Sequence, residues 1–86
     1  MHELSLALEV CRLAENAIYP ADPARVVTVG VVLGDRSSVE PANFEFCLGA
    51  LLQQPPFGHA VPSIARTAGD DLRLDYVEVD DAGPTN

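Results

Sequence analysis

The residues whose types and spacing best suit metal chemistry stand at the amino terminus. The chain opens Met1-His2-Glu3, so an α-amino group, the amide nitrogen of His2 and its imidazole could close two fused chelate rings around one ion. Nitrogen-rich square-planar sites of this kind suit Ni(II) or Cu(II). His2 is too bulky for efficient removal of Met1, and Glu3 offers its side chain or its amide as a further ligand. The alternative is an ordinary start followed by a solvated histidine, because short motifs also match by chance.

No catalytic constellation accompanies this motif. His2 and His59 are the only histidines, and the chain has no G-x-S-x-G elbow, phosphate loop or dinucleotide fingerprint. The two cysteines, Cys11 and Cys47, fall on apolar faces of predicted helices. There they suit small buried hydrophobes better than metal ligands, a disulfide or reactive thiols. The sequence therefore predicts a protein that is not an enzyme.

Composition predicts one small domain and limits its partners. With 86 residues and 48% hydrophobic content, residues 1–79 can build a single modest core, and residues 80–86 read as a flexible acidic tail. We expect a cytoplasmic protein with no membrane partner, because no apolar run reaches the ~18 residues of a membrane span and no signal peptide is recognisable. A net charge of -8 without any lysine argues against nucleic acid as a partner.

The hydrophobic pattern predicts two helices. Apolar residues recur at helical spacing over residues 3–18, and Pro20 ends this helix. A second helix begins with Pro41 in its first turn, preceded by Ser37 and Glu40 at capping-box spacing. The expected core stripes are Leu4, Leu8, Cys11, Ala14 and Ile18 in the first helix, and Phe44, Cys47, Leu48 and Leu51 in the second.

Three further segments read as strands, residues 25–33, 59–65 and 71–79. The first is expected to turn Val27, Val29, Val31 and Leu33 toward the helices, which leaves an opposite face of small apolar residues for another subunit or a partner. In the last strand the alternation changes phase near Tyr76, which predicts a β-bulge. The second and third strands are expected to pair as a hairpin through a turn at Gly69. The predicted fold class is α+β, with two helices packed on one face of a three-stranded sheet.

In this order the segments resemble the HypA/HybF family of nickel-delivery proteins, which serve in building [NiFe] hydrogenases. The resemblance is carried over nearly the whole chain by the opening Met1-His2-Glu3-Leu4-Ser5-Leu6, the strand at 25–33 with Gly34, Val39-Glu40-Pro41, and the closing residues 69–79. Family members insert a zinc domain with two C-x-x-C pairs before the last strand, whereas here residues 63–68 run directly into Gly69-Asp70. Two isolated cysteines do not form a four-thiolate site, so no structural zinc is expected.

The resemblance implies a HypA-type maturation accessory protein that transiently binds or presents Ni(II) at Met1, His2 and Glu3. Its implied partners are the large subunit of a [NiFe] hydrogenase or a maturation GTPase. Because protons compete with the metal for the amine and the imidazole, affinity should fall below about pH 7.

The alternative is a protein-interaction or structural subunit of a hydrogenase-like complex that kept the HypA scaffold without metal delivery. The missing cysteines, the apolar second sheet face and the acidic surface favour it. A homo-oligomer is compatible with either function.

Overall fold

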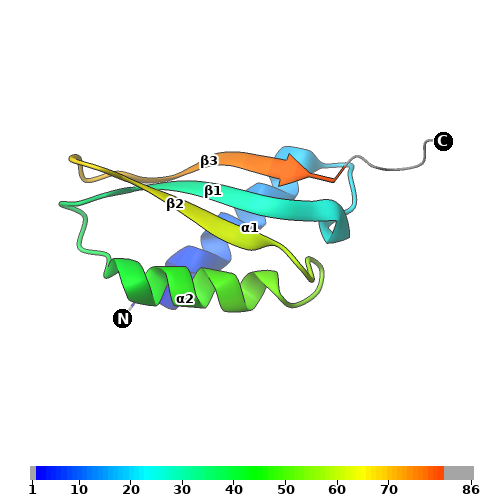
Figure 1. Cartoon of the computed structure of the whole chain (residues 1–86), viewed down its shortest axis with the longest axis horizontal. Helices are drawn as coiled ribbons and strands as arrows, with labels where there is room; N and C mark the ends of the chain where they lie inside the picture. Colours follow the sequence, from blue (N-terminus) through cyan, green and yellow to red (C-terminus); the bar gives the residue numbers. More distant parts are fainter. Residues whose placement is uncertain (1, 81–86) are drawn as a thin grey trace.

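Two helices and three strands make up residues 2–80, the part of the chain that a computed structural model describes. Helices α1 (Glu3–Ile18) and α2 (Pro41–Leu52) lie on one side of a sheet formed by β1 (Val26–Gly34), β2 (Val61–Thr67) and β3 (Leu72–Val79), as Figure 1 shows. A short 3-10 turn, η1 (Pro23–Arg25), leads into β1. The predicted α+β class, with two helices on a three-stranded sheet, is confirmed. Neither helix is long and apolar enough to cross a membrane.

Strand β1 occupies the centre of the sheet, and this overturns the predicted hairpin. The strand order is β2-β1-β3, with β1 parallel to β2 and antiparallel to β3. Helix α2 is the crossover that parallel neighbours require, so β1, α2 and β2 form one β-α-β unit. Strand β3 then pairs on the free edge of β1. Helix α1 packs beneath β3 and α2 beneath β2.

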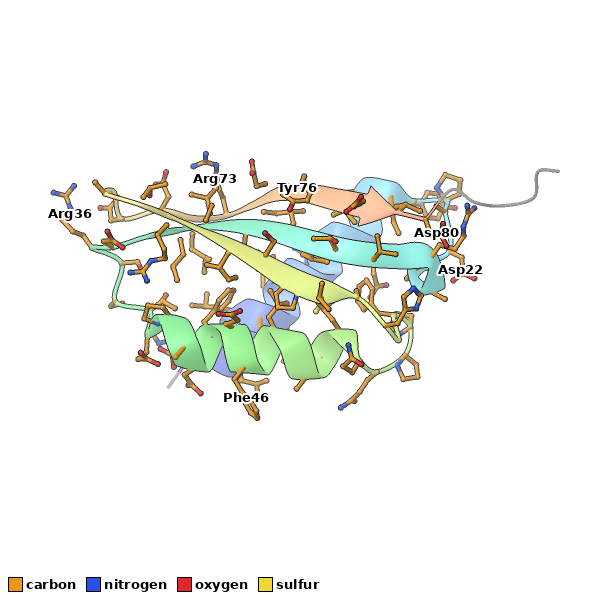
Figure 2. All side chains as sticks on the ribbon, viewed as in Figure 1. Asp22, Arg36, Phe46, Arg73, Tyr76 and Asp80 are labelled. Atoms are coloured by element: carbon orange, nitrogen blue, oxygen red, sulfur yellow. The ribbon has the colours of Figure 1, made fainter. Side chains whose placement is uncertain are left out.

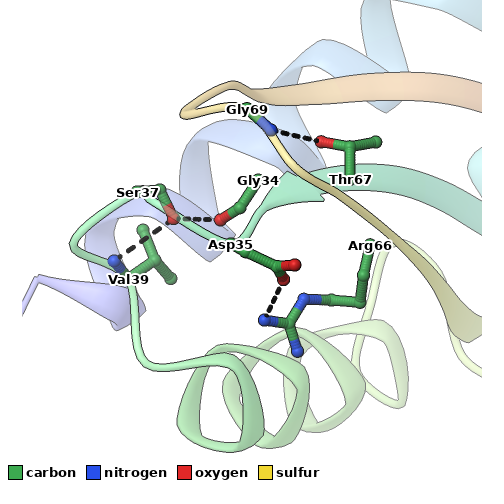
Figure 3. Close-up of polar contacts among 7 residues, drawn as sticks. All are labelled: Gly34, Asp35, Ser37, Val39, Arg66, Thr67 and Gly69. Carbon is green, nitrogen blue, oxygen red and sulfur yellow. Dashed lines mark hydrogen bonds and ion pairs between the residues drawn. The ribbon is translucent and has the colours of Figure 1, made fainter.

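The link between β2 and β3, residues 68–71, crosses the end of β1 at Gly34. Gly34 donates its N–H to the carbonyl of Asp71 at 2.7 Å, and Arg36 donates to the carbonyl of Gly69 at 2.9 Å. A Cβ on Gly34 would lie 2.2 Å from the Gly69 carbonyl oxygen, so only glycine fits beneath the link. Figure 3 shows Gly69 close above the end of β1. Gly69 does not adopt a positive φ; among the glycines of residues 2–80 only Gly58 does.

The connection from β1 to α2 is organised differently from the predicted capping box. The Ser37 hydroxyl donates to the Gly34 carbonyl at 2.9 Å and accepts the N–H of Val39 at 3.4 Å, so it stabilises the turn (Figure 3). Glu40 is itself the N-cap of α2, and its carboxylate accepts the N–H of Asn43 at 2.8 Å. Glu40 stands directly before Pro41 with an extended backbone, which is the geometry of an N-cap.

The predicted bulge near Tyr76 is confirmed, and it places this ring on the outer sheet face. Gly30 pairs with Tyr76 whereas Val31 pairs with Leu74, so Asp75 is the extra residue. A Cβ on Gly30 would lie 2.0 Å from the Tyr76 ring, which shows that the ring lies against the glycine. Val32, on the same face of β1, is only 5% exposed. The small apolar face that was expected to await a partner is therefore partly covered by the chain's own side chains.

A second irregularity in β1 changes which valine enters the core. The pairing with β3 passes from Val26 directly to Thr28, which leaves Val27 unpaired between them. Val26 is consequently fully buried with Val29 and Val31, and Val27 is not, contrary to the simple alternation expected from the sequence.

The buried face of each helix is rotated slightly from the predicted one. Helix α1 buries Ala7, Val10, Cys11 and Ala14, whereas Leu4 and Leu8 are half exposed. The two alanines let α1 approach the sheet closely, so the larger leucines lie at the border of the contact. Helix α2 buries Phe44, Leu48 and Leu52.

The first residue of the predicted tail is attached to the domain. Asp80 donates its N–H to the Arg25 carbonyl at 2.8 Å, and its own carbonyl accepts from the Arg25 guanidinium. The other tail residues, 81–86, lie outside the described residues.

We predict that Gly34→Ala destabilises the fold by about 2–3 kcal/mol, because the new methyl group meets backbone that cannot rotate away. Gly69→Ala is the matched control. Its Cβ would have the Thr67 hydroxyl as nearest neighbour at 4.0 Å, so a change within about 0.5 kcal/mol is expected. Urea unfolding followed by circular dichroism measures both variants. Equal stability of the two would contradict the proposed crossing geometry.

Candidate metal site

His2 stands immediately before α1 with its imidazole in solvent. It occupies the N-cap position, but its side chain makes no capping hydrogen bond. Its carbonyl accepts the N–H of Leu6 and the hydroxyl of Ser5, both at 3.0 Å, so the backbone of His2 is attached to the first turn of the helix. Within residues 2–80 the imidazole therefore stands exposed at the helix end and does not cap it. Met1, the residue predicted to supply the amine, lies outside the described residues.

The Glu3 carboxylate, by contrast, is bound inside the protein. Glu3 is only 6% exposed, and one carboxylate oxygen accepts the backbone N–H of Glu40 at 3.0 Å. The other accepts the side-chain amide of Asn43 at 3.3 Å. The hydrogen bond from the Glu40 N–H lowers the pKa of Glu3 below its ordinary value. Of the two possible metal ligands at Glu3, the carboxylate already has hydrogen-bond partners. The backbone N–H has no partner within the helix, but it also helps to lower the pKa of its own carboxylate.

Glu3 and Glu40 together cap the start of α2. The Glu40 carboxylate accepts the main-chain N–H of Asn43, while Glu3 accepts the Asn43 side chain and the main-chain N–H of Glu40 itself. Two carboxylates at the positive end of one helix dipole are electrostatically favourable. The contact of Glu3 with Glu40 and Asn43 could not be predicted from the sequence, because it joins residues about 40 positions apart and no local pattern encodes it. It fastens the amino-terminal motif to α2.

The remaining candidate ligands are not assembled into a site. Burial, assisted by the negative charge of Glu15, raises the pKa of the Cys11 thiol to about 11, and both Cys11 and Cys47 are free. His59 follows α2, whose 12 residues span ~18 Å, so a whole helix separates it from the start of α2 where Glu3 binds. Among residues 2–80 no cluster of three or more His, Cys, Asp or Glu side chains could hold a metal. A site built on main-chain nitrogens, as predicted at His2, is of a different kind.

Comparison with known proteins places this fold and motif in context. Residues 1–70 match the family described as hydrogenase/urease nickel incorporation, metallochaperone, hypA. The hydrogenase maturation factor HypA of Albidiferax ferrireducens is 43% identical over 51 residues, which cover 59% of this chain and 45% of that protein. The protein of the same name from Dechloromonas aromatica is 41% identical over the same extent. The chain thus spans about half the length of the curated relatives it matches.

We predict that Glu3→Gln lowers the stability of the fold and makes this stability less dependent on pH. A carboxyl group whose folded-state pKa is lowered stabilises the fold fully above its unfolded value, about 4.3, and this contribution is lost as pH falls through the folded value. Wild type should therefore lose stability on acidification below about pH 5, and the variant should lose less. Urea midpoints from pH 7 to pH 3 measure this, with the exposed Glu45→Gln as control. Parallel curves for wild type and Glu3→Gln would show that the buried contact contributes nothing.

Proposed function

The chain belongs to the HypA family, and from this membership we propose that it carries Ni(II) at its amino terminus for the assembly of a [NiFe] hydrogenase. The observation that carries the proposal is the exposed imidazole of His2, which stands immediately before α1 and does not cap it. Nickel is the cargo of such a protein. A small chelate on a chain end should release its metal readily, which suits delivery.

We propose the Met1 amine, the His2 amide nitrogen, the His2 imidazole and the Glu3 amide nitrogen as the ligands. The Glu3 carboxylate is not included, because Glu40 and Asn43 already occupy it. The first N–H groups of a helix have no intrahelical partner, and the first helical hydrogen bond of α1 runs from Leu6 to His2. The amides of His2 and Glu3 could therefore lose their protons to a metal without breaking the helix. A square-planar set of nitrogens suits Ni(II).

Glu3 has a positioning role in this proposal. Its carboxylate fixes the first turn of α1 against α2, while its main-chain nitrogen would serve as a ligand. Groups that orient ligands in this way typically change metal affinity by about 10–100-fold when they are removed. The expected loss in a Glu3 variant is thus in affinity, with the ligand set unchanged.

We further propose that the protein works without structural zinc, in the cytoplasm, on the large subunit of a [NiFe] hydrogenase or a maturation GTPase. The two cysteines support the first point, since one is buried with a raised pKa and the other packs against the core. Reduced thiols suit the cytoplasm.

We predict that the untagged chain binds one Ni(II) with the ligand-field absorption of a square-planar nitrogen site, and that His2→Ala abolishes this absorption. Glu3→Gln should keep the spectrum and weaken affinity about tenfold. Affinity should fall with acid, because protons compete for the amine and imidazole. A changed ligand-field spectrum in Glu3→Gln would show that the Glu3 carboxylate is a nickel ligand.

His59→Ala is the matched control for loss of a histidine. If wild type and His2→Ala bind nickel equally, or neither binds, the delivery proposal is wrong. A protein-interaction module on the HypA scaffold would then be the better account, and copurification of a partner that survives His2→Ala would support it.

A further inference from the structure

Phe46 stands on the outside of α2, where residues 2–80 leave most of its ring uncovered. It is 74% exposed, whereas Phe44 and Phe57, the other two phenylalanines, are buried. Figure 2 shows its ring pointing away from the sheet, on the far side of α2. A phenyl ring carries a large apolar surface, and leaving it in water costs free energy that burial against a partner would recover.

The surroundings of the ring leave it accessible. Ala42 and Ala50, four residues before and after Phe46, are its neighbours along the helix surface, and both are small and exposed. With Glu45 and Phe46 itself, these exposed residues form what we call the α2 outer face. Small residues on either side of an aromatic ring allow another backbone to approach closely while the ring enters a pocket.

The charge around the α2 outer face determines which kind of partner would bind there. Residues 37–65 contain no lysine or arginine, and Glu45, beside the ring, makes no ion pair among the described residues. The whole chain carries -8. A second copy docked on the same face would bring like charges together, which is unfavourable, whereas a basic surface would be attracted and oriented. Charge complementarity thus favours a basic partner over self-association.

We propose that the α2 outer face is a docking surface for a basic protein partner, which accepts the Phe46 ring in an apolar pocket bordered by lysine or arginine. Asn43, one helical turn before Phe46, binds the Glu3 carboxylate. A partner on this face would therefore reach the start of α2, to which the amino terminus is fastened. Binding at this surface does not require nickel, so it is tested independently of the proposed nickel delivery.

The test uses the metal-free, full-length chain and a synthetic amphipathic helix with leucine on one face and lysine on the other. Holes between leucines on such a helix accept apolar side chains. We expect chemical shifts of the isotope-labelled chain to change mainly along α2. Phe46→Ala should weaken binding about tenfold, the effect of losing one anchoring side chain. Glu45→Gln should weaken binding less and reduce its salt dependence. Tyr19→Ala, a residue 82% exposed, is the matched aromatic control and should bind as wild type does.

The proposal is wrong if the lysine helix does not bind, if the shift changes lie away from α2, or if Phe46→Ala binds the helix as tightly as wild type does. Equally tight binding of the same helix with glutamate in place of lysine would also overturn it. Sedimentation of the chain alone tests the competing occupant: self-association that Phe46→Ala abolishes would assign the face to a second copy.

Discussion

Strand β1 makes hydrogen bonds along both of its edges, and the positions of all other elements follow from this. Its parallel partner β2 requires the crossover helix α2, and its antiparallel partner β3 takes the remaining edge. Val29 and Val31 of β1 are buried in the same core as Phe44 and Leu48 of α2. The end of β1 at Gly34 also begins the connection that delivers Glu40 to the start of α2. The central strand therefore determines where Glu3 finds its partners.

The contact of Glu3 with α2 joins the two halves of the molecule at the place where metal chemistry is proposed. Glu3 is at once the first residue of α1 and an acceptor for the main chain of Glu40. A histidine placed one residue earlier is thereby presented at a fixed helix end. The nitrogen atoms proposed as nickel ligands lie outside the helical hydrogen bonds of α1, and the carboxylate that joins Glu3 to α2 is not among them.

Features of the fold with a local signal in the sequence are predicted correctly. The bounds of α1, the strand rich in β-branched residues and the bulge at Tyr76 all follow from periodicity within a few residues. Features that depend on contacts between residues far apart in the chain are not predicted correctly. The predicted hairpin ignored the preference of a strand-helix-strand segment for parallel pairing, and Val27 lost its core position to Val26 through an unpredicted irregularity. At the site, the exposure of His2 was predictable, but the long-range binding of Glu3 by Glu40 and Asn43 was not.

The crossing of residues 68–71 over Gly34 has a consequence for how this scaffold tolerates growth. Strands β2 and β3 share no ladder with each other, so the register of each is set by β1 alone. A longer segment placed between Thr67 and Leu72 would give up the contacts over Gly34 and leave every strand pairing intact. Loop closure becomes only slowly more costly with length. A longer segment at this position would therefore leave the pairing of all three strands unchanged.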